Sequence, residues 1–386
     1  MHVLYYAIYG RIMVMLLRVK KFIQNNIVCS IAFVLALITC IFVPIDREYI
    51  HYIDYKTISS LFMISYIIAA FKDINFFYLL AKQIIIKFKT LRMSYLALIT
   101  ITFAGSMLIA NDMALITFLP LGYLLLKETG HEDKEAFVFI MQNIAANLGG
   151  MLTPFGNPQN LYIYTKYNIA SIAFMKIMII PFLVAIILLY LSGSLIENTE
   201  LTINEKPVSI DKTREIVYVS LFILAVLIVF RLIHPLIGLI VIPTVIFIFD
   251  RRAFKSVDYT LLLVFVFFFI FSSNLVRINQ INSFFSKLLQ RDVYFTTLIS
   301  CQFMSNVPTS ILLSKFTNDY IPLLYGVNIG GLGTLIASLA SLITFRTYIK
   351  LNPKKALQFI LLFSFINLIF IVIESFVIVN LRYVIH

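Results

Sequence analysis

Long apolar runs extend from one end of this 386-residue chain to the other, among them 27–43 and 177–191. An α-helix needs roughly 20 consecutive apolar residues to cross a bilayer, so the length of the chain allows about ten crossings. A membrane β-barrel would instead show short segments of alternating polarity. The sequence therefore predicts an all-α polytopic membrane protein with about ten transmembrane helices.

The composition agrees with this class. The chain is 61% hydrophobic and 13% charged, whereas soluble proteins are about 45–50% apolar and about 25% charged. A net charge of +12 in a soluble protein would suggest nucleic acid. Here we expect the basic residues to hold loops on the cytoplasmic side, with the lipid bilayer and not nucleic acid as the partner.

Enzyme signatures are missing from the sequence. The three cysteines have no C-x-x-C spacing, which argues against a disulfide framework or a zinc site. No H-E-x-x-H or G-x-S-x-G motif occurs. We therefore expect neither an enzyme nor a bound cofactor, and an integral membrane enzyme is only a remote alternative.

The longest polar connection divides the chain into two halves. The predicted parts are a cytoplasmic N-terminal segment, a first repeat, a cytoplasmic linker and a second repeat, at 1–26, 27–194, 195–214 and 215–386. If the N-terminus is cytoplasmic and the interrupted runs 94–126 and 293–316 re-enter on their own sides, then 72–92, 195–214, 250–258 and 346–355 fall inside. Most of the 31 Lys and Arg residues then lie on the cytoplasmic side. We expect a multi-pass protein of the cytoplasmic membrane.

The two halves share an order of features. Each has a span, an amphipathic stretch, an apolar run broken at an asparagine, and a helix ending in Asn-x-Gly-Gly. The breaks lie at Asn111 and Asn306, and the two motifs begin at Asn147 and Asn328. Because the 27–44 span would run outward and its partner 235–249 inward, we predict inverted repeats, each with a re-entrant helical hairpin and a broken helix. This pattern indicates a secondary-transporter site at mid-membrane.

The breaks are expected to form a binding site because unpaired backbone groups are costly in hydrocarbon and survive only beside a cavity. Carbonyls and asparagine side chains can ligate a cation, and half-helix N-termini can hold an anion. Asp112 is the candidate proton carrier, since a carboxylate inside an apolar run costs about 2.5–3.5 kcal/mol on insertion scales. Glu374, near the outer end of the last apolar run, is expected only to reach the interface.

Three stretches carry a family resemblance: Asn111-Asp112, residues 147–160, and Ser305-Asn306 followed by residues 328–335. Through them the chain resembles the ion-transporter superfamily of arsenical-pump membrane proteins, sodium–proton antiporters, and citrate and divalent-anion:sodium symporters. It looks most like the citrate-transporter-like bacterial permeases. The resemblance implies hairpin tips that meet at the substrate, an elevator movement, and often a homodimer.

The predicted binding residues all lie at or beside one of the breaks. They are Asn111, Asp112, Asn147, Gly149, Gly150, Thr153, Gly156, Asn157, Pro158, Asn160, Ser305, Asn306, Asn328, Gly330, Gly331 and Thr334. Within this set, one site is expected at Asn111, Asn147, Thr153 and Asn157, and a second, matching cluster at Ser305, Asn306, Asn328 and Thr334. Na⁺ is expected at Asn111, Asn157 and Asn306.

The tips depart from the symporter pattern, which is Ser-Asn-Thr in both halves. Here the tips read Ala110-Asn111-Asp112 and Ser305-Asn306-Val307. These departures favour proton coupling through Asp112 and leave sodium open. The expected function is secondary active transport of a small anion or oxyacid, coupled to H⁺ or Na⁺, by an elevator mechanism. The alternative is a Na⁺/H⁺ antiporter on the same scaffold.

Overall fold

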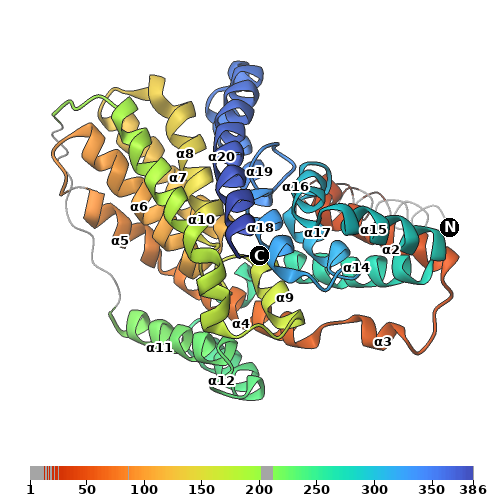
Figure 1. Ribbon diagram of the computed structural model, residues 1–386. Helices are drawn as coiled ribbons and strands as arrows, with labels where there is room; N and C mark the ends of the chain where they lie inside the picture. Colours follow the sequence, from red (N-terminus) through yellow and green to blue (C-terminus); the bar gives the residue numbers. More distant parts are fainter. Residues whose placement is uncertain are drawn as a thin grey trace, which may run out of the picture. The chain divides into compact units, whose positions relative to one another are not determined.

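A computed structural model describes residues 22–24, 26–85, 87–200 and 212–385, together with Met13, Met15, Leu17 and Lys20. Most of the predicted segment 1–26 and of the predicted linker 195–214 lies outside the described residues. Every named element in the described ranges is a helix, which confirms the all-α class (Figure 1). The described chain separates into two compact units, Met1–Asp54 with Asp258–Phe284 and Tyr55–Val257 with Phe285–His386.

The helices of membrane-crossing length are fewer than the predicted ten. Within the described ranges, four are long and apolar enough, namely Leu91–Ile109, Ser171–Leu195, Tyr259–Arg277 and Pro353–Leu381. The pair Tyr55–Asp73 and Phe76–Gln83, bent by 59°, makes a fifth if it is one span. Shorter apolar helices of 10–17 residues also occur. These helices agree with a polytopic membrane chain, and ten crossings stay a prediction.

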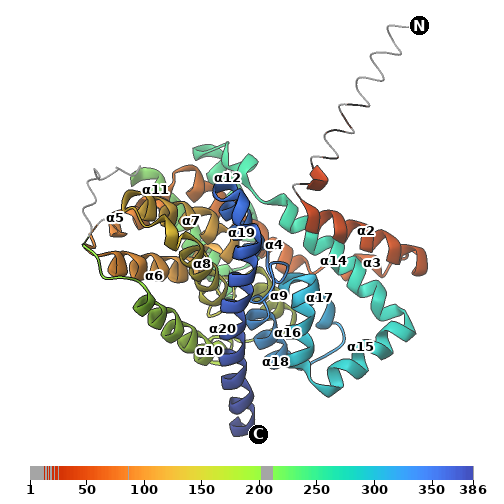
Figure 2. The same ribbon diagram turned by 90° about the horizontal axis from the view of Figure 1, so that it is seen from above.

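The smaller unit is built on two apolar helices, α2 (Ile27–Phe42) and α14 (Tyr259–Arg277), which lie side by side in Figures 1 and 2. Ala32 and Ala36 of α2 are buried, and their small side chains allow the two helices to pack closely. Asn274 Nδ2 donates a hydrogen bond to Thr39 Oγ1 at 3.2 Å across the pair. The short helix α3 (Tyr49–Tyr52) and the start of α15 (Asn279–Arg291) complete the unit.

The larger unit begins with α4 (Tyr55–Asp73) and the short helix α5 (Phe76–Ile85), joined through Asn75 at φ 52°. The next helices are α6 (Leu91–Ile109), α7 (Asn111–Glu128), α8 (Glu135–Gly149), α9 (Pro158–Lys166) and α10 (Ser171–Ser192). Helix α8 packs against both α6 and α7 and is buried over almost its whole length. It therefore forms the centre of the first half.

The unit continues with α11 (Lys212–Val229), α12 (Pro235–Phe249) and α13 (Ala253–Ser256). After α15 come α16 (Val293–Met304), α17 (Asn306–Leu313), α18 (Tyr320–Ile329), α19 (Leu339–Leu351) and α20 (Ala356–Ile385). The packing of the first half recurs here, because α16 contacts α17 and α18 as α6 contacts α7 and α8. The halves also exchange partners, since α7 packs on α19 and α17 packs on α9.

Both ends of the α6–α7 pair contact the same short segment of the chain, residues 196–197. Near the start of α6, Arg92 Nε donates a hydrogen bond to the carbonyl of Ile196 at 2.9 Å. After the end of α7, Lys134 Nζ lies 3.6 Å from Glu197 Oε1. The pair therefore begins and ends at one end of the larger unit. In the second half, Phe285 before α16 stacks on Phe316 after α17 at a centroid distance of 5.0 Å.

Candidate functional site

A single residue separates the two helices in each of the pairs α6–α7 and α16–α17, and these two residues adopt the same unusual backbone conformation. Ala110 has φ 64° and ψ 154°, and Ser305 has φ 73° and ψ 156°. This region is nearly confined to glycine, and other residues persist in it only where the surrounding structure imposes it. We call Ala110–Asp112 the first tip and Ser305–Val307 the second tip. The next side chain then folds back, because Asn111 Oδ1 and Asn306 Oδ1 each accept the following backbone N–H, at 3.0 and 2.9 Å.

Each tip faces a helix that ends early. Helix α8 ends at Gly149, and an irregular segment leads to Pro158, the first residue of α9. Helix α18 ends at Ile329, and another irregular segment leads to α19. Glycine is required at Gly150, where an added Cβ would clash with the side chain of Asn157 and the carbonyl of Gly156. The chain thus places an interrupted helix beside each tip.

Equivalent threonines hold the two irregular segments to the two helix pairs. Thr153 Oγ1 donates to the carbonyl of Met107 at 2.8 Å, and Thr334 Oγ1 donates to the carbonyl of Gln302 at 3.0 Å. In each half the acceptor lies four residues before the asparagine of the tip. These contacts place Thr153 and Thr334 in supporting positions next to the tips.

A buried network of asparagine side chains joins the first tip to both broken helices. Asn111 Nδ2 donates to Asn147 Oδ1 at 2.9 Å. Asn157 Nδ2 donates to the carbonyl of Asn147 at 3.2 Å and to Asn328 Oδ1 at 3.4 Å. Asn328 Nδ2 in turn donates to Asn160 Oδ1 at 2.7 Å. All five side chains are buried, and Asn328 from the second half thereby joins the residues of the first half.

One oxygen of this network is left over. Asn157 Oδ1 is buried and accepts no hydrogen bond from any residue that the structure describes. A buried polar atom without a partner costs about 1–3 kcal/mol and calls for an explanation. An amide oxygen is a ligand that hard cations accept, so Asn157 could supply one ligand to a bound cation.

The second tip has a different environment. The backbone N–H of Asn306 donates to the carbonyl of Ala337 at 2.9 Å. A Cβ added at Gly331 would lie 2.8 Å from Asn306 Nδ2, so the absence of a side chain lets the tip approach the broken helix. Asn306 is buried, Ser305 is half-buried and Thr334 is exposed. The four residues predicted as a second cluster are therefore divided, because Asn328 turns to Asn157 and Asn160.

The remaining predicted residues support the site. Asp112 is buried in the first turn of α7, where the helix dipole favours a negative charge. Asn160 Nδ2 donates to the carbonyl of Gly150 at 3.2 Å and so satisfies part of the irregular segment. Gly156 and Gly330 are also buried beside the breaks.

Two residues of the site escaped the sequence analysis. Gln302 Nε2 donates to the carbonyls of Gly330 and Leu332 at 2.9 and 3.0 Å, and thereby holds the second irregular segment. Asn143 of α8 accepts a hydrogen bond from Thr344 of α19 at 3.2 Å. Both are amides inside apolar runs, and this signal could have identified them.

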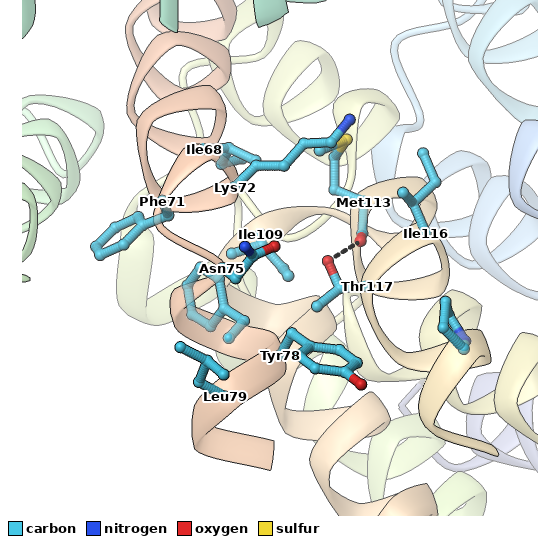
Figure 3. Close-up of a pocket in the computed structure, with 12 residues that line it drawn as sticks. Ile68, Phe71, Lys72, Asn75, Tyr78, Leu79, Ile109, Met113, Ile116 and Thr117 are labelled. Carbon is cyan, nitrogen blue, oxygen red and sulfur yellow. Dashed lines mark hydrogen bonds between the residues drawn. The ribbon is translucent and has the colours of Figure 1, made fainter. Parts of the chain in front are cut away.

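A cavity of about 340 Å³ lies beside the first tip, between α4 and α5 on one side and α6 and α7 on the other (Figure 3). Ile109 and Met113, which flank the tip in sequence, both line it. Its polar lining comes from Lys72, Asn75 and Thr117, with Tyr78. This volume falls within the range of small-molecule sites.

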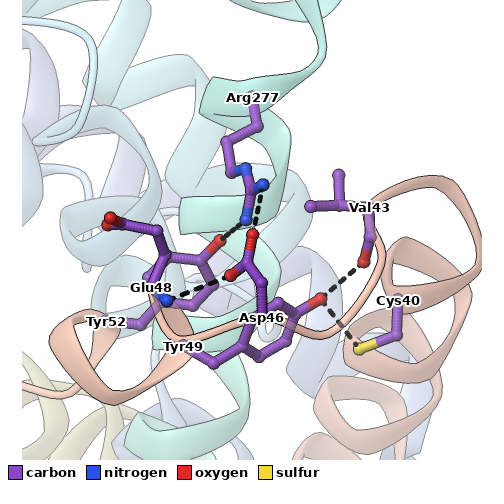
Figure 4. Close-up of polar contacts among 7 residues, drawn as sticks. All are labelled: Cys40, Val43, Asp46, Glu48, Tyr49, Tyr52 and Arg277. Atoms are coloured by element: carbon purple, nitrogen blue, oxygen red, sulfur yellow. Dashed lines mark hydrogen bonds and ion pairs between the residues drawn. The ribbon is translucent and has the colours of Figure 1, made fainter.

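A second polar cluster belongs to the smaller unit (Figure 4). Arg277 Nη2 forms an ion pair with Asp46 Oδ2 at 2.6 Å, and Nη1 donates to the hydroxyl of Tyr52 at 2.9 Å. Tyr49 donates its hydroxyl to the carbonyl of Val43 at 2.7 Å. The Arg277 guanidinium holds the pKa of the Asp46 carboxyl below its ordinary value of 3.8. This cluster ties the connection after α2 to the end of α14.

Comparison with known proteins matches most of the chain. A sequence model described as citrate transporter matches residues 12–318, which include both tips and residues 147–160. An uncharacterized transporter of Methanocaldococcus jannaschii is 35% identical over 302 residues, which cover 78% of this chain and 82% of that protein. The inner membrane protein YbiR of Escherichia coli is 28% identical over 246 residues, covering 62% of this chain and 66% of that protein.

Proposed function

This chain belongs to the citrate transporter family, and on that premise we propose that it is a secondary active transporter moving a small anion or oxyacid, coupled to H⁺ or Na⁺. The carrying observation is the pair of tips with matching backbone geometry at Ala110 and Ser305. Each tip faces a broken helix, and buried asparagines join the broken helices of the two halves. Two tips closing on one site suit an occluded substrate better than continuous conduction.

The topology that we propose rests on contacts among the segments expected in the cytoplasm. Ser256 Oγ donates to Asp73 Oδ1 at 3.2 Å, which joins the predicted inner loop 250–258 to the end of α4. Asn352 Nδ2 donates to Glu135 Oε2 at 3.1 Å, next to the Lys134–Glu197 ion pair. These hydrogen bonds and this ion pair join basic segments of the chain to one another, and we assign all of these segments to the cytoplasmic side. The α6–α7 pair then re-enters from that side.

We assign the coupling ion and the substrate to different features of the site. A cation would use Asn157 Oδ1 and the carbonyls of the irregular segments. An anion would rest on the N-termini of α7, α9 and α17, because unpaired N–H groups and the helix dipole favour negative charge there. The cavity beside Met113 would serve as its approach, with Lys72 as a cation in its lining.

An elevator movement fits the way in which the halves exchange partners. Helix α7 of the first pair packs on α19, and α17 of the second pair packs on α9. Both tips and both broken helices can therefore move as one body, because each pair is anchored to the broken helix of the other half. We propose this body as the transport domain.

Flux through the tips tests the proposed function. In liposomes that contain the purified protein, Asn111→Ala and Asn306→Ala should each remove most of the gradient-driven uptake of labelled citrate or a small oxyacid. Asn380→Ala is the matched control, since this exposed amide donates only to the carbonyl of Phe376 in its own helix. Flux at the wild-type level in both tip variants would contradict the site.

Proton coupling has its own test at Asp112. Asp112→Asn keeps the size of this buried side chain but cannot release a proton. Flux in this variant should lose its dependence on external pH while substrate exchange at equal pH continues. A sodium requirement with unchanged pH dependence in the variant would assign coupling to Na⁺ instead.

The antiporter is the second candidate, and the neutral amide lining favours it. No basic residue stands at either tip, and Asn157 Oδ1 is an unused buried acceptor among the described residues. Counterflow separates the two functions. Unlabelled anion on the far side should accelerate uptake of labelled anion in an anion transporter, whereas an antiporter should respond only to Na⁺ and H⁺.

A further inference from the structure

Glu374 of α20 is a buried carboxyl that the site described above does not use. Its side chain is 0% exposed. Neither Oε1 nor Oε2 has a hydrogen-bond partner among the residues that the structure describes. The expectation that this side chain only reaches the membrane interface is therefore wrong, because helix packing covers it completely.

The face of α20 that carries Glu374 adjoins the second broken helix. Asn367, two turns earlier on the same face, lies with Oδ1 3.5 Å from the backbone N–H of Gly333. A Cβ added at Gly333 would lie 3.1 Å from Ile371 Cδ1, one turn before Glu374. The neighbouring Ser375 shares a hydrogen bond of 2.7 Å with the hydroxyl of Tyr294 in α16. Glu374 thus lies where α20 meets elements that carry the second tip.

No charged side chain in the described ranges compensates Glu374. Helix α20 packs against α8, α10, α18, α19 and the turn before it. The ionisable groups on these elements and on α16 are Glu135, Lys176, Tyr190, Tyr294, Cys301, Tyr320, Tyr325, Arg346, Tyr348, Lys350, Lys354 and Lys355. None of them forms an ion pair or hydrogen bond with Glu374. Along its own helix, the next charged residue in sequence is Arg382.

The charge state follows from these contacts. An ionised carboxylate removed from water without a partner carries a penalty of several kcal/mol, whereas the protonated acid carries only that of a polar group. Glu374 is therefore neutral in this arrangement. Ionisation requires water or a cation, and either would have to enter between α20 and its neighbours.

We propose that Glu374 is a second proton-binding site, distinct from the tips, whose occupancy changes as the transport domain moves. The proton is held while α20 is packed against the second broken helix. It is released when movement of α16 and α18 admits water to the carboxyl. The link to movement rests on the proposed transport function, while the bound proton does not.

Infrared spectroscopy tests the bound proton without any transport. The carbonyl stretch of a protonated carboxylic acid is resolved from that of carboxylates. Purified protein at neutral pH should show this band, and Glu374→Gln should lose the part of it that Glu374 contributes. Glu48→Gln, the same change at an exposed carboxyl, should keep it. An acid band of equal intensity in wild type and Glu374→Gln would overturn the proposal.

The stoichiometry of transport tests the change in occupancy. Glutamine resembles the protonated acid in shape, so Glu374→Gln should fold and should still exchange substrate. It should move one proton fewer per substrate than wild type, measured with a pH-sensitive dye in liposomes. Glu374→Asp, which retains an acid, should restore the count. An unchanged number of protons per substrate in Glu374→Gln would refute the change in occupancy. Absence of all flux in wild type would refute the transport function alone.

Discussion

At the scale of single residues, each tip combines a strained backbone residue with an asparagine whose side-chain oxygen accepts a hydrogen bond from the next backbone N–H. Ala110 and Ser305 occupy a backbone region that costs about 1–3 kcal/mol for residues other than glycine. The strain is held because Asn111 bonds to Asn147 on one side and Asn306 is fixed by the carbonyl of Ala337 on the other. Surrounding contacts fix both tips, and this keeps the two asparagines in the positions that we propose for binding.

The strain at the first tip predicts an order of stabilities. Ala110→Val should lower the free energy of unfolding by about 1–3 kcal/mol, because a β-branched side chain tolerates this conformation worse than alanine. Ala110→Gly should leave it equal or raise it, because glycine adopts the conformation freely. Thermal unfolding in detergent measures both.

Ala104→Val is the control, at an exposed position of α6 where only helix propensity, below about 0.7 kcal/mol, is at stake. Equal losses for Ala104→Val and Ala110→Val would show that the tip stores no strain.

At the scale of elements, broken helices are stable only when side chains satisfy their backbone. Gln302 bonds to the carbonyls of Gly330 and Leu332, and Asn160 bonds to that of Gly150. The connection between α2 and α3 follows the same rule, because Tyr49 donates to the carbonyl of Val43 and Asp46 Oδ1 accepts the backbone N–H of Glu48. Arg277 then anchors this connection to α14 through Asp46 and Tyr52.

The anchor at Asp46 predicts a pH-dependent stability. The folded pKa of this carboxyl is lowered, chiefly by the hydrogen bond from Arg277. The pair therefore adds stability that is present above the ordinary value of 3.8 and is lost as the pH falls through the folded pKa. Asp46→Asn should lower the unfolding temperature by about a few degrees at most at neutral pH, since the pair is exposed.

The difference between wild type and Asp46→Asn should disappear in acid, and Glu48→Gln should show no such pattern. A difference that persists below the folded pKa would mean that packing, not charge, explains the loss.

At the scale of the whole molecule, the α6–α7 and α16–α17 pairs are each seated on a broken helix of the other half. This exchange explains how residues more than 170 positions apart, such as Asn157 and Asn328, share a hydrogen bond. If the two halves are inverted repeats, the connections between their helices must lie on the cytoplasmic and external sides in a fixed order.

That order predicts opposite labelling of two exposed lysine positions. Lys287→Cys on α15 should react with a membrane-impermeant maleimide on intact cells. Lys354→Cys, before α20, should react only after the membrane is opened. The native cysteines give little background, because Cys29 and Cys301 are buried and Cys40 is half-buried. Labelling of position 354 from outside would invert the proposed topology.

The sequence by itself determined the all-α membrane class, the transporter family and the positions of the breaks. These depend on local properties, because apolar runs predict helices and the residues at the breaks interrupt them. Tip and motif residues such as Asn111 and Asn147 could be named for the same reason.

Only the tertiary structure decided which residues meet. It joined Asn328 to Asn157 and Asn160, which separated Asn328 from the predicted second cluster, and it brought in Gln302 and Asn143. It also covered Glu374 on all sides. No local pattern carries this information, because hydrogen-bond partners and burial depend on contacts between helices that lie far apart in the chain.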